Sequence, residues 1–172
     1  MAAEATEGTE RQEPTVRVVE FTLGGERFAV HVTDVDNIED PEGVTRIPRT
    51  GEAIEGVMDL RGEITAIIDP RVHLDVDAEP TTEEQQVLVL DQSKDKQKLG
   101  FRVDRIHGVE NYPESAVEDT EDFPELDSTG VQRQAIRAII RGPSEESDFE
   151  PIGLVDADEI VRLSRQGRGA GR

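Results

Sequence analysis

The side chains that could perform chemistry are scattered along this chain and do not form the spacings that catalytic or metal sites need. The three histidines, His31, His73 and His107, lie far apart, and none belongs to a His-x-x-x-His or Glu-x-x-His pair, so no zinc site is expected. The chain has no cysteine, which excludes a thiol nucleophile and a cysteine metal site.

Other fragments of ligand-binding motifs are incomplete. The Asp-x-Asp pairs at 34–36 and 75–77 resemble calcium ligands, but the first lacks the mid-loop glycine and the closing glutamate of an EF-hand. Gly24-Gly25 precedes a strand and not a helix, so it is not a phosphate loop. No serine stands in a Gly-x-Ser-x-Gly setting. The sequence therefore predicts neither an enzyme nor a cofactor.

One arginine differs from the rest because the elements around it would fix its direction. Arg61 belongs to Arg61-Gly62-Glu63, a tight-turn signal between apolar strand patterns at 57–60 and 64–68. Asp69-Pro70 ends the second strand, since proline cannot continue a ladder. An arginine in such a turn is usually a solvated residue. Held at the tip of a hairpin, it would also suit recognition of a carboxylate.

Strand signals occur on both sides of this hairpin. A Gly24-Gly25 turn joins alternating segments at 16–23 and 28–32, and Thr33 is expected to cap a short helix containing Val35 and Ile38. The other expected strands span residues 44–48, 87–90, 99–103, 135–140 and 151–155. Asp156 is expected to cap a final helix that ends near Ser164.

The chain repeats itself weakly, which predicts two similar β units. The hairpin at 18–32 with Val35 and Ile38 is echoed by residues 87–103 with Ile106 and Val109, and the hairpin at 57–69 is echoed by 136–156. We expect subdomains of approximately 16–70, completed by later strands, and 87–155, packed closely together. Residues 1–15 and 165–172 are predicted as flexible tails, 72–84 as an acidic connector and 113–130 as a long acidic surface loop.

Composition gives information on environment more than on function. The 19 basic residues face 39 acidic ones, for a net charge of −20, which disfavours binding to nucleic acid or to anionic membranes. Only three basic residues are lysines, all at 94–98, and this balance resembles proteins of extreme halophiles, including haloarchaea. No apolar segment is long enough to span a membrane, and the acidic N-terminus is unlike a signal peptide, so a cytoplasmic protein is expected.

Several segments together resemble the CheW-like domain family of prokaryotic chemotaxis coupling proteins. They are Phe21-Thr-Leu-Gly, Phe28-Ala-Val, Val44-Thr-Arg-Ile-Pro, Gly56-Val-Met-Asp-Leu-Arg-Gly, Ile67-Ile-Asp, Gly100-Phe-Arg-Val-Asp-Arg-Ile-His-Gly-Val and Ile152-Gly-Leu-Val-Asp. The resemblance covers about residues 16–164. It implies a mainly β fold of two interlocked five-stranded SH3-like barrels with short helices, a C-terminal helix and a shared apolar core. It also implies an adaptor, without catalysis, that couples the histidine kinase CheA to the cytoplasmic tips of chemoreceptors in membrane-associated arrays.

The same resemblance implies a partner-binding region at the hairpin and the segment after residue 34. Its residues are Val35, Asn37, Ile38, Gly56, Val57, Asp59, Leu60, Arg61 and Gly62. The family usually has a glutamate where this chain has Asn37, so the partner of Arg61 is left open, and Asp59 replaces an asparagine and adds a negative charge. Asp69-Pro70-Arg71 also departs from the usual Asp-Leu-Arg, and Ala138 from a common glycine.

Two other functions are compatible with the sequence. A stand-alone ligand-binding or sensory β domain would need a pocket of roughly 300 Å³ or more between the two halves, and the sequence provides no convergent polar residues for one. A structural β protein would keep the repeat without the family's role. For many apolar residues, including Phe21, Phe28, Ile64 and Phe101, simple core packing is the ordinary interpretation.

Overall fold

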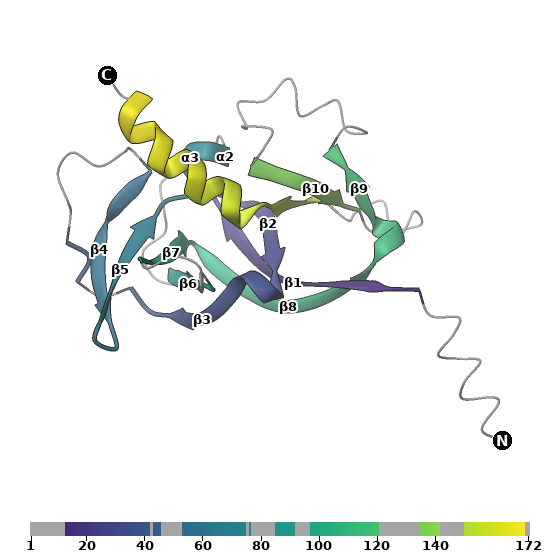
Figure 1. Ribbon diagram of the computed structural model, residues 1–172. Coiled ribbons are helices and arrows are strands. Elements are labelled where there is room, and N and C mark those ends of the chain that lie inside the picture. The colour runs from purple at the N-terminus through teal and green to yellow at the C-terminus, as the bar shows by residue number, and fades with distance from the viewer. Residues whose placement is uncertain are drawn as a thin grey trace.

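The protein is mainly β, as expected, and its strands form two sheets that share one core (Figure 1). The computed structural model describes residues 13–41, 43–45, 53–74, 76, 85–91, 97–120, 135–141 and 150–170. Sheet A runs in the order β8 (Arg105–Pro113), β1 (Thr15–Leu23), β2 (Glu26–His31), β11 (Ile152–Val155), β10 (Ile136–Ile140) and β9 (Val117–Asp119). Sheet B runs in the order β3 (Val35–Glu39), β6 (Gln86–Leu90), β7 (Lys98–Val103), β5 (Glu63–Ile68) and β4 (Ile54–Leu60).

The two halves of the chain exchange strands, which makes the sheets interlocked. Sheet A takes β1 and β2 from the first half and its other strands from the second half. Sheet B takes β6 and β7 from the second half and β3, β4 and β5 from the first. In each sheet a parallel pair, β2 with β11 or β7 with β5, joins the contributions of the two halves. Neither half can therefore complete a sheet alone, which explains why the repeat folds as one unit.

Each sheet curls so that its two edge strands approach each other. In sheet A the chain passes from β8 through the 3-10 turn η2 (Glu114–Ala116) directly into β9 at the opposite edge. In sheet B the segment that follows β3 returns to β4, where Thr45 and Val57 exchange two backbone hydrogen bonds of 2.8 Å. The strand β9 and the Thr45 bridge hold equivalent places in the repeat, and among the described residues that place forms a sixth strand only in sheet A.

The apolar core has three parts that follow from this arrangement. The largest includes Phe21 and Phe28 of sheet A, Phe101 of sheet B and Ile160 of the C-terminal helix, so it joins both sheets. The rings of Phe21 and Phe28 stack with centroids 6.2 Å apart. Each sheet has a smaller cluster of its own on the opposite face, around Leu154 in sheet A and Ile67 in sheet B. The expected shared core is thus present, together with one core for each barrel.

The C-terminal helix α3 (Ala157–Ala170) begins as the sequence predicts. The Asp156 carboxylate accepts a hydrogen bond of 3.2 Å from the backbone N–H of Glu159, which is the expected cap. The helix is longer than expected, because it continues past Ser164 to Ala170 and runs toward the short helix α2 (Arg71–Leu74) in Figure 1. Buried His73 of α2 lies 3.1 Å from the Ser164 hydroxyl, which links the two helices. None of the helices in the described ranges is long and apolar enough to cross a membrane.

Several elements differ from the predictions based on sequence. The expected helix at Val35 and Ile38 is the strand β3, preceded by the 3-10 turn η1 (Val32–Asp34), because its backbone pairs with β6. Residues 72–74 of the predicted connector belong to the helix α2, and residues 114–119 of the predicted loop form η2 and β9. Ile64, interpreted as a core residue, is 55% exposed. Most of the predicted strand at 44–48 lies outside the described residues.

Asp34 of η1 provides a first testable consequence of the packing. Burial and then the nearby charge of Asp158 raise the pKa of Asp34 above its usual value, so its ionised form opposes folding. A carboxyl with a raised folded pKa binds its proton more tightly in the folded state. The penalty is therefore full at neutral pH and disappears as pH falls below the unfolded pKa.

We expect Asp34→Asn to raise the free energy of unfolding at pH 7 by less than about 1 kcal/mol, since solvent screens part of the repulsion. Urea unfolding at pH 7 and at pH 3.5, in the same salt, measures the gain. The gain should vanish at pH 3.5. An equal gain at both pH values would show that the charge of Asp34 is not the cause.

Candidate partner-binding site

The hairpin of β4 and β5 holds Arg61 at its tip in an unusual backbone conformation. Strand residue Leu60 pairs with Glu63, which leaves Arg61 and Gly62 as a two-residue turn. Both have positive φ, 55° for Arg61 and 86° for Gly62, as the tight hairpin turn that matches strand twist requires. Arg61 is the one described residue other than glycine with positive φ. The turn thus fixes the direction of the arginine at a small backbone cost.

Asp59 stabilises this turn through its side chain. Its Oδ1 accepts a hydrogen bond of 2.9 Å from the backbone N–H of Gly62. The carboxylate that replaces the family's usual asparagine thus has a local structural role, and an asparagine could accept the same bond.

We expect Asp59→Ala to lower the free energy of unfolding by about 0.5–1.5 kcal/mol, because the Gly62 N–H loses its acceptor. Asp59→Asn keeps the acceptor and removes the charge, so its stability should match the original protein. Urea unfolding of the two variants, side by side, measures the difference. Equal losses in both would show that the charge, and not the hydrogen bond, matters.

The partner of Arg61 is Glu39, at the end of the edge strand β3. Arg61 Nη2 lies 3.0 Å from Glu39 Oε2, and the arginine side chain is 76% exposed while that of the glutamate is 17% exposed. Asn37 Nδ2 donates to the same Glu39 oxygen over 2.7 Å. The acid that pairs with Arg61 is therefore Glu39, two residues after the position where the family usually has a glutamate. Asn37, which occupies that position, supports Glu39 by its hydrogen bond.

The bulge in β3 explains why the sequence did not point to Glu39. The pairing of β3 with β6 shifts between Val35 and Asn37, so Val35 contacts the shared core while Asn37 and Glu39 turn to the other face. Asn37 and Glu39 are two residues apart, so the strand places them on one face, which the expected helix would not do, and the bulge leaves Val35 on the opposite face. In the described part of the chain, Asn37 Oδ1 is the one buried side-chain nitrogen or oxygen atom without a hydrogen-bond partner.

A second ion pair links the same two elements through β7. Lys98 Nζ lies 3.4 Å from Asp36 of β3 and 3.6 Å from Glu63 of β5. Gln97 donates to the backbone oxygen of Ile64 over 2.9 Å. Lys98, Gln97 and Ile64 therefore join the region around the hairpin tip, and sequence reasoning assigned none of them to it. The exposure of Ile64 on a strand of otherwise buried apolar residues is the signal that the structure adds.

The structure brings together most of the residues expected in the partner-binding region, but it does not expose them equally. Arg61, Gly62 and Asp59 form the exposed tip, and Ile38 is 41% exposed on β3. Val35 and Leu60 are half-buried, each packed against an apolar cluster, and Gly56 is buried. Val57 is half-buried beside Thr45. Val35 and Leu60 thus support the surface more than they provide it.

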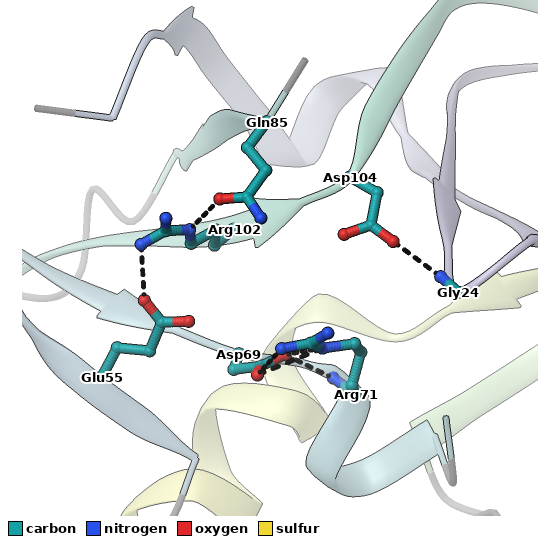
Figure 2. A network of polar contacts seen from close by, with 7 residues as sticks. All are labelled: Gly24, Glu55, Asp69, Arg71, Gln85, Arg102 and Asp104. Carbon is teal, nitrogen blue, oxygen red and sulfur yellow. Dashed lines mark hydrogen bonds and ion pairs between the residues drawn. The ribbon is translucent and has the colours of Figure 1, made fainter. Parts of the chain in front are cut away.

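Polar contacts hold the other end of the hairpin (Figure 2). Arg102 of β7 donates to Gln85 over 2.6 Å and to Glu55 of β4 over 2.9 Å. Asp69, at the end of β5, binds Arg71 through both oxygens, with a shortest distance of 2.6 Å. These hydrogen bonds raise the pKa of Arg71 above its usual value. Asp69 and Arg71, which flank the unusual Pro70, therefore form a tight local clamp at the hairpin root.

Figure 2 also shows how sheet B is tied to sheet A at this point. Asp104, just after β7, accepts a hydrogen bond of 2.7 Å from the backbone N–H of Gly24 in the turn between β1 and β2. The hairpin is thus anchored at its root and exposed at its tip, which is the geometry of a rigid docking element. Among the described residues, no group of three or more His, Asp or Glu side chains could hold a metal ion.

This combination of two barrels with exchanged strands and an arginine-tipped hairpin defines a protein class. The family model of the CheW-like domain matches residues 17–164, nearly the whole described chain. The chain belongs to the CheW-like domain family.

Similar proteins agree with this assignment. The chain is 28% identical over 145 residues to the chemotaxis protein CheW of Bacillus subtilis, covering 84% of this chain and 86% of that one. It is 30% identical over 105 residues to the chemotaxis protein CheW of Helicobacter pylori, covering 60% and 62%. The crystal structure of the scaffolding protein TtCheW from Thermoanaerobacter tengcongensis matches with a TM-score of 0.68 and 24% identity, over 83% of this chain and 90% of that one. That likeness shows the fold, two SH3-like barrels.

Proposed function

We propose that the protein is a chemotaxis adaptor that binds a CheA histidine kinase and the cytoplasmic tips of chemoreceptors, and that it carries out no catalysis itself. Family membership supports the coupling role, since the similar proteins are named as chemotaxis CheW proteins and one as a scaffold. The protein would act in the cytoplasm, recruited to arrays at the membrane, and would be a monomer until its partners assemble it.

The exposed and oriented side chain of Arg61 is the main structural support for this proposal. Its guanidinium is held by Glu39 from one side and remains 76% exposed, so a partner carboxylate could add to an existing ion pair. The turn and the anchored root set its position before binding, which lowers the entropy cost of association. Arginine in such a position is a common source of binding energy at interfaces.

Apolar contacts should add to the arginine, above all in high salt. At molar ionic strength the Debye length is about 3 Å, so ion pairs that stay exposed contribute little, whereas a pair between Arg61 and a partner carboxylate that the interface buries is screened much less. Ile38 and Ile64 are the large apolar residues exposed on β3 and β5, at 41% and 55%. Substitution of Ile38 by serine should therefore weaken binding more than removal of an acidic surface residue. Ile38 is a better choice for the test than Val35 or Leu60, because those two also support the core.

The test is direct binding to two separate partners in roughly molar KCl. Isothermal titration would use the regulatory domain of the cognate CheA in one experiment and a receptor tip fragment in the other. Saturable binding to both supports the adaptor. Folded protein that binds neither would contradict it and favour the stand-alone ligand-binding domain.

A further inference from the structure

A row of polar and cationic side chains crosses three strands of sheet A, on the barrel that does not carry Arg61. Thr22 of β1 stands directly opposite Arg27 of β2 on one side and Arg105 of β8 on the other. Residues in direct register share a face of the sheet, with Cβ atoms about 5 Å apart. The two arginines therefore flank one hydroxyl.

A β-bulge brings a histidine into the same row. The pairing of β8 with β1 jumps from Gly108 opposite Glu20 to Ile106 opposite Phe21, so His107 is the extra residue of β8. Gly108 at φ +128° accommodates the bulge. The imidazole Nε2 of His107 then lies 2.5 Å from the Thr22 hydroxyl. His107, Arg27 and Arg105 are all exposed, so the row is open to solvent.

Among the described residues, Glu20 is the acid that acts on this row, and its carboxylate is bound from inside the sheet. Glu20 is 1% exposed and accepts a hydrogen bond from the Tyr112 hydroxyl. It also accepts one from Arg27 Nη1 over 3.1 Å. This is the one side-chain hydrogen bond that Arg27 makes among the described residues, so its remaining guanidinium N–H groups are available on the outer side, where the side chain is 47% exposed.

The electrostatics agree with this arrangement. Burial and then the positive charges of Arg27 and Arg105 lower the pKa of His107, while Glu20 opposes them. Both guanidinium groups therefore act on the same imidazole, in a chain whose net charge is −20. Arg27 on β2 and Arg105 on β8 flank β1, so an anion bound between them would lower the repulsion between the two positive charges.

We propose that Arg27, Arg105, His107 and Thr22 form a binding site for one free tetrahedral oxyanion, an inorganic sulfate or phosphate. Donors that come from three separate strands approach a ligand from several directions, which suits a tetrahedral anion better than a planar carboxylate. Protonation of the His107 imidazole strengthens the site in two ways. It adds a positive charge, and it makes Nε2 the donor to Thr22, which frees the threonine proton for the anion.

Nuclear magnetic resonance of the three histidine rings tests the site in the full chain, with sulfate as the probe because it stays fully ionised between pH 5 and 8. Added to a constant molar KCl background, sulfate should shift the His107 ring signals saturably and leave His31 and His73 nearly unchanged. The affinity should be at least about threefold higher at pH 5 than at pH 7.5, since a unit charge is added. A parallel, linear drift of all three histidines would overturn the proposal.

Matched variants separate the site from a general salt effect. Arg27→Gln should abolish the saturable shift, whereas Arg162→Gln, at an exposed arginine on α3, should keep it. Arg27→Gln also weakens the environment of buried Glu20, so His107→Gln provides a second variant. In this variant, sulfate binding is followed through the ring signals of Tyr112, the one tyrosine in the chain. The affinity for sulfate should not increase at low pH. A folded His107→Gln variant that still binds sulfate more tightly at pH 5 than at pH 7.5, as the original protein does, would also contradict the assignment.

Discussion

Replacement of Arg61 by asparagine should weaken binding to the kinase regulatory domain at least tenfold, a loss of about 1.4 kcal/mol or more. The substitution removes the exposed guanidinium and the contact with Glu39. Asparagine tolerates the left-handed conformation that residue 61 adopts at φ 55°, so the turn should survive. The affinity measured by isothermal titration should therefore change strongly, whereas the free energy of unfolding measured in urea should change by less than about 0.5 kcal/mol.

A matched control is Arg162→Gln. Arg162 is also an exposed arginine in an ion pair, 2.6 Å from Glu159, but it lies on α3. Loss of one exposed ion pair there should leave kinase binding unchanged. Similar losses of affinity in both variants would mean that general charge, and not the position of Arg61, controls association.

Gly100 of β7 should not accept a larger residue without a loss of stability. A Cβ atom at this position of β7 would lie 2.6 Å from Cγ1 of Val87 and 3.3 Å from the backbone oxygen of Leu88. Val87 is fully buried and β-branched, so it cannot rotate away easily. We expect Gly100→Ala to lower the free energy of unfolding by about 1–3 kcal/mol, measured by urea unfolding.

A double-mutant cycle shows whether this clash is the cause. Val87→Ala alone should destabilise by about 2 kcal/mol through the cavity it leaves. Combined with Gly100→Ala, it removes the atom that the new methyl group would meet, so the double variant should lose less than the sum of the two. Strict additivity would indicate that the backbone oxygen of Leu88 in β6, and not Val87, makes glycine necessary.

The hairpin was predictable from sequence because its signals are local. Alternating apolar residues on both sides of Arg61-Gly62 define two strands, and the charged glycine turn defines the tip. The cap of α3 at Asp156 was predictable for the same reason, since the carboxylate bonds to an N–H three residues away. Such features depend on residues that are neighbours in the chain.

The partner of Arg61 was not predictable, because it depends on pairing between distant segments. Glu39 reaches the arginine only since β3 is a strand beside β6 and contains a bulge. The sequence around Val35 and Ile38 is compatible with a capped helix, and tertiary pairing overrides that preference. The arrangement at His107 has the same origin, a bulge that no local pattern indicates.

The exchange of strands was visible only in outline. The repeat predicts two similar units, but not that β1 and β2 of one unit would share a sheet with β10 and β11 of the other. The resemblance to the family supplied that topology. It also supplied the residues of the partner-binding region, since composition and spacing alone would not distinguish Arg61 from a solvated turn residue.

Co-elution shows whether one molecule of this protein connects a kinase to a receptor. The CheA regulatory domain and a receptor tip fragment would be passed together over a sizing column in roughly molar KCl, with and without this protein. We expect a single peak that contains all three components. Kinase and receptor should elute separately when this protein is omitted or carries Arg61→Asn. Kinase and receptor that remain separate in the presence of the folded protein would contradict the adaptor role.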